Sequence, residues 1–190
     1  MKYHDTESLV VLDDQSNSKK FKSFRDIETA LPVVRSYFPI KGEVLIKEAD
    51  SITAASNRLR KNFCSAVDYL YTDHGKVVVS GIGKSGHLGK KLAATFCSTG
   101  SPAAFLHPSE AVHGDLGIHQ NGDPVLLLSN SGSTPELLAL EPILKRRGAK
   151  LVGIFGNTSG QLVAKVDAFL DSSVPEEADP LGIKKKGLNI

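Results

Sequence analysis

The stretch Val77–Gly89, VVVSGIGKSGHLG, decides the fold of this chain. Its β-branched start is typical of a strand that is buried on both faces. Glycines follow, with Lys84 and Ser85 at the turn, and a helical pattern comes next. Glycines let backbone N–H groups approach an anion, and a helix N-terminus supplies partial positive charge. The stretch therefore predicts a strand–loop–helix unit that binds phosphate in an α/β protein.

The chain after Tyr71 alternates between short apolar runs and helical patterns. Strands are expected at residues 76–80, 103–106, 124–129, 151–156 and 168–171, and helices at 85–98, 107–113, 136–147 and 160–166. This alternation over short loops predicts a parallel sheet with helices on both faces. Ligands of such sheets lie beyond the carboxyl ends of the strands, near the point where the strand order reverses.

The segment from Gly42 to Tyr71 predicts one long amphipathic helix. Its apolar residues recur at three- and four-residue steps, namely Leu45, Ala49, Ile52, Ala55, Leu59, Phe63, Ala66 and Leu70. We expect this stripe to pack on the body of the domain. The helix is also long enough to leave surface for a second subunit.

The two ends of the chain are interpreted separately from the domain. Residues 1 to about 22 are polar and predict a mobile arm, in which only Leu9–Leu12 could dock as a strand. Residues 24–38 carry a weak helical pattern, and Pro39 gives a boundary. The expected division is therefore an arm with a short helix at 1–40, a domain at 41–183 and a basic tail at 184–190.

Composition argues against several classes of protein. The 190 residues are 41% hydrophobic, which is enough for a globular core, and the formal net charge of +2 disfavours nucleic-acid binding through bulk charge. The N-terminus lacks the apolar core of a signal peptide, and no uncharged apolar run approaches the ~20 residues of a membrane helix. Cys64 and Cys97 lie far apart and are expected to be reduced and buried. These features predict a soluble, cytoplasmic protein.

Two familiar nucleotide motifs fit the first loop poorly. Residues 81–86 satisfy GxGxxG, but a dinucleotide site also needs an acidic residue about 20 positions on, and Glu110 lies past that place. A lysine inside the glycine pattern is unusual as well. The Gly83-Lys84-Ser85 triplet does not make a P-loop, because the required first glycine is replaced by Val78.

The second loop, SNSGSTPE at residues 129–136, indicates the ligand class. Four hydroxyl side chains and Gly132 stand between a strand and a helix. Each hydroxyl can donate to a phosphate oxygen, and the free N–H groups of the helix start add further donors. The alternative is a plain helix cap with Thr134 as the N-cap residue. So many hydroxyls in one loop favour a small phosphomonoester held by Ser129, Ser131, Gly132, Ser133 and Thr134.

SxSGxTxE after a strand, preceded by GxGKSGxxG, resembles the phosphosugar-binding fold of the sugar isomerase (SIS) family. The blocks HPSEA (107–111), HGDLG (113–117) and PLG (180–182) further resemble the arabinose-5-phosphate isomerases. The resemblance covers roughly residues 42–183. It implies a three-layer, doubly wound, flavodoxin-like α/β domain with a five-stranded parallel sheet, usually in a homo-oligomer. The implied reaction interconverts D-ribulose 5-phosphate and D-arabinose 5-phosphate on the pathway to Kdo and lipopolysaccharide.

Such an isomerisation needs a base that moves a proton between C1 and C2 and a group that stabilises the enediolate oxygen. Lys84 follows a strand, where its ammonium could reach the sugar, and Glu136 lies in the first turn of a helix, where it could equally be a capping carboxylate. By the resemblance both match catalytic positions. Glu177 is preferred over Glu176 because it precedes Ala-x-Pro-Leu-Gly, and His113 matches a residue that touches substrate.

The resemblance adds binding residues and a metal position. Gly100 and Ser101 match a substrate contact, and Ser85 is expected to face the sugar beside Lys84. His107 matches a metal-contacting position, although a single histidine is a poor zinc site. The expectation is that no cofactor is required, with zinc at His107 as the metal that the resemblance allows.

The family pattern continues after Pro-Leu-Gly with a Ser/Thr-rich segment, a helix, a histidine that serves the active site and, in most members, paired CBS modules. Here Ile183 is followed by the tail Lys184–Ile190. The sequence thus leaves two hypotheses, an arabinose-5-phosphate isomerase and a non-catalytic module that binds a sugar phosphate or a nucleotide sugar. A third, NAD binding, is weaker.

Overall fold

The structure, a computed structural model, describes residues 9–12, 18–21, 38–72 and 74–178 in two compact units. The first unit comprises residues 1–50 and 178–190, and the second comprises Ser51–Glu177. In the first unit β1 (Leu9–Leu12) and β2 (Ser18–Phe21) form an antiparallel pair. Helix α2 (Phe38–Leu70) begins in the first unit and continues into the second. Among the described helices, none combines the length and the apolar character needed to cross a membrane.

Three predictions concern this first unit. Leu9–Leu12 is a strand as expected, but Ser18–Phe21 is a strand too, because pairing with β1 satisfies its backbone without an apolar face. Pro39 is not a boundary and lies in the first turn of α2, where a missing N–H costs no hydrogen bond. The predicted short helix before Phe38 and the tail at 184–190 lie outside the described residues.

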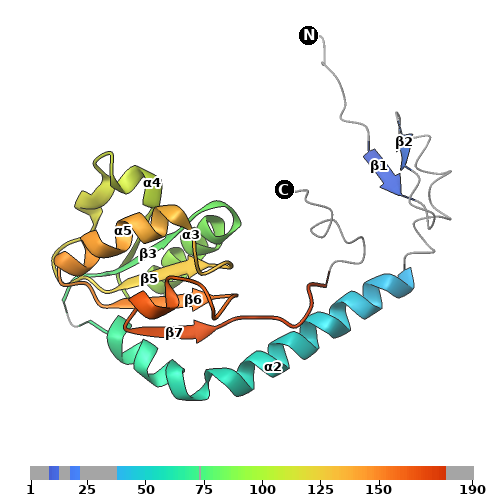
Figure 1. The fold of residues 1–190 in the computed structure, drawn as a ribbon, viewed down its shortest axis with the longest axis horizontal. Helices are drawn as coiled ribbons and strands as arrows, with labels where there is room; N and C mark the ends of the chain where they lie inside the picture. Colours follow the sequence, from blue (N-terminus) through green and yellow to red (C-terminus); the bar gives the residue numbers. More distant parts are fainter. Residues whose placement is uncertain (1–8, 13–17, 22–37, 73, 179–190) are drawn as a thin grey trace, which may run out of the picture. The chain divides into compact units, whose positions relative to one another are not determined.

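The second unit is built on a five-stranded parallel sheet (Figure 1). Its strands are β3 (Val77–Gly81), β4 (Ala103–Leu106), β5 (Val125–Ser129), β6 (Leu151–Phe155) and β7 (Ala168–Asp171). Their spatial order is β4-β3-β5-β6-β7, so the chain first moves outward from β3 to β4 and then returns to the other side of β3. The predicted doubly wound α/β fold is confirmed, and the strand order reverses between β3 and β5.

The connections contain α3 (Gly83–Ser98), α4 (Pro108–Ala111) and α5 (Pro135–Arg146), with 3-10 turns η1 (Asp115–Ile118) and η2 (Val163–Lys165). Helices α3 and α5 begin one or two residues earlier than expected. Proline at the first position of α5 explains one shift, because its fixed φ suits a helix start. The helix expected at 160–166 is only the short 3-10 turn η2.

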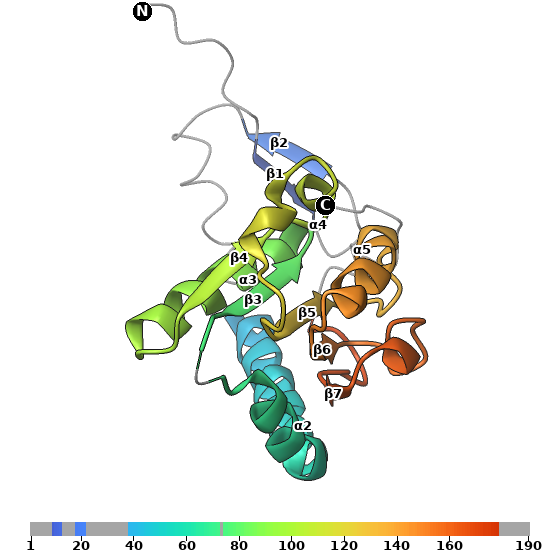
Figure 2. The ribbon, with the colours of Figure 1, turned by 90° about the vertical axis from the view of Figure 1, so that its left-hand side faces the viewer.

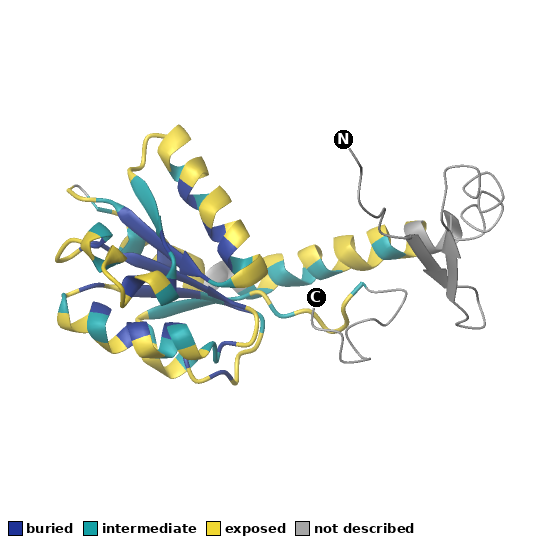
Figure 3. Ribbon diagram, turned by 90° about the horizontal axis from the view of Figure 1, so that it is seen from above, coloured by how far each residue is buried: buried dark blue, intermediate teal, exposed yellow. Residues whose placement is uncertain are grey.

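Helices cover both faces of the sheet, which gives three layers (Figure 2). One apolar cluster joins Leu127 of β5 to Leu140 of α5. The cluster on the opposite face joins Val79 of β3 to Ala66 of α2 and Ala93 of α3. Figure 3 shows the buried strands between helices whose outer surfaces are exposed. The central strands β3 and β5 are buried along their whole length, so they are continuous apolar runs rather than alternating ones, whereas the edge strands β4 and β7 are mostly half-buried.

Two expectations about burial are wrong. In the second unit Ala66 is buried, but Ile52 and Phe63 of the same α2 stripe are more than half exposed. Cys64 and Cys97 are free thiols, as expected, but both are exposed rather than buried.

A buried polar cluster stands at the amino end of the sheet. The His119 ring is fully buried, and its Nε2 lies 3.0 Å from the carbonyl oxygen of Asp123, to which the neutral imidazole donates. Burial lowers the pKa of His119 below its usual 6.5. Burial of Asp123 would raise the pKa of that carboxyl, but hydrogen bonds from Lys76 Nζ and from backbone N–H groups outweigh it and lower the pKa.

Because of this buried cluster, we expect acid to destabilise the protein. Below about pH 6.5 the unfolded chain binds a proton at His119 that the folded chain does not bind, so the free energy of unfolding falls as pH drops. Denaturant unfolding at pH 7.5 and pH 5.5 should show the loss, and His119→Gln should reduce the difference between the two. An unchanged pH dependence in His119→Gln would contradict the assignment to this histidine.

Candidate active site

The loops after β3 and β5 lie side by side at the carboxyl edge of the sheet. Gly81, the last residue of β3, is in register with Leu128 of β5. Helix α3 begins just beyond the first loop and α5 just beyond the second, so two helix N-termini face the same edge. This is the position where the strand order reverses, and in sheets of this kind it is the place where ligands bind.

Most glycines of the first loop are explained by packing. A Cβ on Gly86 would lie 2.9 Å from the carbonyl oxygen of Gly81, and a Cβ on Gly89 would lie 2.9 Å from the Phe105 ring. They therefore let α3 pack closely on β3 and β4. Gly83 differs, because it has a positive φ of 58° and open space around it.

The N-terminus of α3 carries the predicted lysine. The helix starts at Gly83, and, as in any helix, the first N–H groups have no intrahelical acceptor. The N-cap residue Ile82 does not supply one either, because it makes no side-chain capping bond. Lys84 is exposed in this first turn and Ser85 is half-buried. An ammonium and a hydroxyl thus stand at the edge of the sheet, as the sequence predicted.

The second loop is held together by its own hydroxyl groups. Ser129 is buried, and its Oγ accepts the N–H of Gly132 at 3.0 Å and bonds Thr134 Oγ1 at 2.7 Å. Ser131 Oγ accepts the N–H of Ser133 at 3.2 Å. Ser133 Oγ in turn accepts the N–H of Gln161 at 3.0 Å. These contacts fix the loop in one conformation.

The same contacts test the alternative that this loop is only a cap for helix α5. Thr134 is the N-cap residue of α5, as that alternative expects, but its hydroxyl bonds Ser129 and makes no capping bond. Ser129 and Thr134 therefore shape the loop. Ser131 Oγ accepts the N–H of Ser133 and lies 3.4 Å from Ser129 Oγ, and Ser131 is exposed at the edge of the sheet. The contacts of Thr134 therefore do not support the capping alternative.

A third segment, residues 156–162 after β6, braces the hydroxyl loop and was not foreseen from the sequence. Leu162 N–H donates to the Gly132 carbonyl at 2.8 Å. A Cβ on Gly160 would lie 2.5 Å from Gly132 Cα, and a Cβ on Gly156 would lie 2.1 Å from Asn130 Oδ1. The only sign of this contact in the sequence was the pair of glycines, Gly156 and Gly160, that follows β6.

The brace is itself tied to α5 by an ion pair. Glu141 of α5 is buried, and its carboxylate lies 3.0 Å from Lys165 Nζ of η2 and 3.3 Å from Lys145 Nζ. A buried carboxylate with two cationic partners fixes the distance between α5 and η2. The hydroxyl loop is therefore held from both of its sides.

The remaining predicted residues are spread over three places. Glu136 is half-buried in the first turn of α5, where the helix dipole favours a carboxylate. His107 follows β4 as the N-cap residue of α4, half-buried, with its ring edge-on to Phe105 at 6.4 Å. The buried Nδ1 of His107 has no hydrogen-bond partner in the structure as described. His113 is exposed in the turn after α4.

Gly100 and Ser101 do not join these groups. They precede β4 and lie at the amino end of the sheet, whereas Ser131 follows β5 at the carboxyl end. Glu177 is exposed after β7, the edge strand that β5 and β6 separate from β3. The structure thus brings the two loops, Lys84 and Glu136 to one edge and leaves the roles predicted for Gly100, Ser101 and Glu177 as predictions.

The donor set for zinc is small. Within the described ranges, no group of three or more His, Cys, Asp or Glu side chains is placed to hold a metal ion. His107 alone does not make a zinc site, since structural and catalytic zinc take three or four protein ligands. Zinc at His107 stays a prediction, and no step of the reaction proposed for this site uses it.

Comparison with known protein families identifies the family to which this domain belongs. Residues 70–185 match the model of the SIS domain. The chain belongs to the SIS-domain family. Its SIS domain is similar to arabinose 5-phosphate isomerase KdsD of Pseudomonas aeruginosa, with 46% identity over 136 residues, and to KdsD of Escherichia coli K12, with 44% identity over 141 residues. These alignments cover 72% and 74% of this chain but only 42% and 43% of the relatives.

Solved structures agree with this assignment. The SIS domain is similar to protein c3406 of Escherichia coli CFT073 in complex with arabinose 5-phosphate, with 38% identity and a TM-score of 0.72, over 78% of this chain and 79% of that one. Tagatose-6-phosphate ketose/aldose isomerase from Escherichia coli, at 19% identity and a TM-score of 0.56, shares the fold over 73% of this chain and 40% of its own.

Proposed function

We propose that this SIS domain is an aldose–ketose isomerase that interconverts D-ribulose 5-phosphate and D-arabinose 5-phosphate. The observation that supports it most is the hydroxyl loop at the N-terminus of α5, which is braced from behind and exposes Ser131 at the sheet edge. The KdsD relatives are arabinose 5-phosphate isomerases, and the chain spans less than half of their length. The proposed reaction belongs to the pathway to Kdo and lipopolysaccharide.

The phosphate would bind at the start of α5. Ser131 donates its hydroxyl, and the N–H groups of the first helical turn and the helix dipole favour the dianion. The loop is preorganised by Ser129 and by the brace after β6, so little conformational entropy is lost on binding.

The proton transfer would use the groups beside that loop. In the aldose-to-ketose direction the Glu136 carboxylate takes the proton from C2, and negative charge develops on the carbonyl oxygen at C1. The Lys84 ammonium stabilises this oxyanion. Glu136 then returns the proton to C1, while the proton of the C2 hydroxyl moves to the C1 oxygen. His113 and Glu177 are further proposed catalytic residues, by their match to family positions.

The wider setting of this activity is also proposed. The protein is expected to work in the cytoplasm as a homo-oligomer, on a small sugar phosphate, without nucleic acid or a membrane and with no required cofactor. The composition supports the exclusion of nucleic acid, because Lys and Arg number 23 against 21 Asp and Glu.

The test of the reaction is an NMR measurement on the full chain. Incubation with D-ribulose 5-phosphate should produce D-arabinose 5-phosphate, and in heavy water deuterium should appear at the carbon that exchanges its proton. The second candidate is a non-catalytic sugar-phosphate module, which the separation of Gly100 and Ser101 from the hydroxyl loop favours. Thermal stabilisation by arabinose 5-phosphate without any turnover would support this candidate and overturn the isomerase.

Ser131→Ala tests the phosphate contact. We expect it to weaken arabinose 5-phosphate binding by roughly 1–3 kcal/mol, because a phosphate oxygen loses its donor. Isothermal titration calorimetry measures the change, and Ser98→Ala at the far end of α3 is the matched control. Equal affinities of Ser131→Ala and the parent chain would remove the hydroxyl loop from the site.

A further inference from the structure

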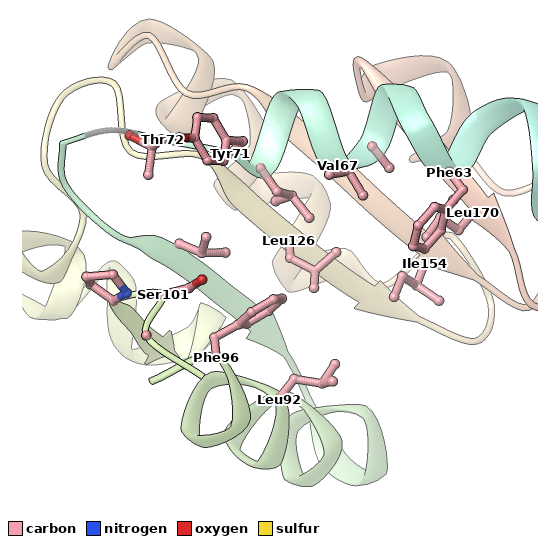
Figure 4. Close-up of a pocket in the computed structure, with 15 residues that line it drawn as sticks. Phe63, Val67, Tyr71, Thr72, Leu92, Phe96, Ser101, Leu126, Ile154 and Leu170 are labelled. Carbon is pink, nitrogen blue, oxygen red and sulfur yellow. The ribbon is translucent and has the colours of Figure 1, made fainter. Parts of the chain in front are cut away.

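The two faces of the sheet are covered in different ways. On the side of α2 and α3, the sheet borders an apolar cavity of about 530 Å³, whose described lining residues are all uncharged (Figure 4). On the opposite face, α5 packs Leu137, Leu140 and Leu144 into the core, and Glu141 of the same helix is only 4% exposed. A carboxylate this deeply buried is costly unless it is paired, so its partners show what it does.

One of the two partners of Glu141 would be enough to compensate its charge. Lys145 lies one turn further along α5, with its Nζ 3.3 Å from Glu141 Oε1, and a pair at this spacing needs no second element. The other carboxylate oxygen, Oε2, lies 3.0 Å from Nζ of Lys165 in η2. The second ion pair therefore adds a connection between two elements, beyond the compensation of charge.

Lys165 is linked through η2 to the segment that braces the hydroxyl loop. The N–H of Lys165 donates to the carbonyl oxygen of Leu162 at 2.9 Å, and the N–H of Leu162 donates to Gly132 at 2.8 Å. The N–H of Gln161 donates to Ser133 Oγ at 3.0 Å. Gly132 and Ser133 lead directly into α5, which carries Glu141. The contacts thus form a closed ring from α5 to η2, to the hydroxyl loop and back to the start of α5.

We propose that Glu141 and Lys165 are positioning residues, which hold the hydroxyl loop in the conformation that binds phosphate without contacting the ligand themselves. Desolvation of a buried ion pair largely offsets its attraction, so an apolar pair of similar volume is often at least as stable. A charged pair in contact at 3.0 Å, however, holds α5 and η2 at one distance, which two apolar side chains would not do. The role of the pair in binding rests on the phosphate site proposed at residues 129–136.

The double variant Glu141→Met with Lys165→Met separates position from stability. It removes one charge of each sign, so the net charge that attracts a phosphate dianion is unchanged, and methionine adapts to the space. We expect the midpoint of denaturant unfolding to stay the same or rise, while the affinity for D-arabinose 5-phosphate in calorimetry falls by about tenfold. Parent-level affinity in the folded double variant would overturn the proposal.

Hydrogen exchange measured by NMR provides a readout that needs no ligand. In Lys165→Met, Glu141 keeps Lys145 as its partner, and the amides of Gln161 and Leu162 should exchange about tenfold faster than in the parent chain. Lys150→Met is the matched control, because it removes another ion pair of 3.0 Å, to Asp167, at the amino end of β6. This control should leave both amides and the affinity unchanged.

The two measurements together also separate this proposal from the proposed function. Parent-level exchange in Lys165→Met would overturn the positioning role, and if binding were weakened at the same time, Lys165 would be a direct phosphate ligand. A parent chain without affinity for D-arabinose 5-phosphate would overturn the proposed function, whereas the exchange rates alone decide whether the ion pair positions the loop.

Discussion

Lys84→Ala is expected to lower kcat for arabinose 5-phosphate isomerisation by roughly 10²–10⁴-fold, while KM changes far less. Lys84 is exposed in the first turn of α3, beside the edge where β3 and β5 end, and it makes no part of the hydroxyl loop that would hold the phosphate. Its ammonium would act on charge that develops only during the reaction, and the loss of such an interaction appears in kcat.

Lys91→Ala, on the exposed side of the same helix, is the matched control and should leave both constants unchanged. Steady-state kinetics with circular dichroism spectra of each variant separates the outcomes. If kcat stays the same in Lys84→Ala and KM alone rises, Lys84 is a binding residue and the proposed stabilisation of the enediolate is wrong.

Gly160→Ala should abolish most of the affinity for arabinose 5-phosphate, by roughly 100-fold, although residue 160 follows β6 and carries no functional group. The new Cβ would lie 2.5 Å from Gly132 Cα, C and O, and this backbone cannot yield without moving the hydroxyl loop. The stability cost of such overpacking is about 1–3 kcal/mol.

Gly42→Ala is the control for this variant, because its added Cβ meets no described atom within 4 Å beyond the neighbouring backbone of its own helix, and alanine favours that helix. Calorimetry and thermal unfolding should be measured together. Intact binding by a folded Gly160→Ala protein would show that the contact between Gly160 and Gly132 does not position the site.

The fold was predictable because the strands are recognisable from short local stretches of sequence. Val77–Val79 and Leu126–Leu128 are continuous apolar runs, which only a sheet covered on both faces explains, and the glycine turn and the hydroxyl loop mark the ends of β3 and β5. Adjacent strand ends then follow from the strand order. The two loops of the candidate site could therefore be named from the sequence.

What could not be predicted depends on contacts between distant residues. The brace exists because Gly160 meets Gly132, and the sequence shows only that both are glycines. The different roles of the loop hydroxyls could not be predicted either. Ser129 is buried and Ser131 is exposed, and the sequence does not distinguish the two. Likewise the α2 stripe is regular, but which half of it lies over the sheet is a tertiary property.

A crystal structure of the full chain with D-arabinose 5-phosphate tests the central claim most directly. The phosphate should lie within hydrogen-bond distance of Ser131 Oγ and of N–H groups in the first turn of α5, with the C1–C2 end of the sugar near Lys84 and Glu136. A phosphate bound at the N-terminus of α3, or anywhere away from residues 129–136, would contradict it.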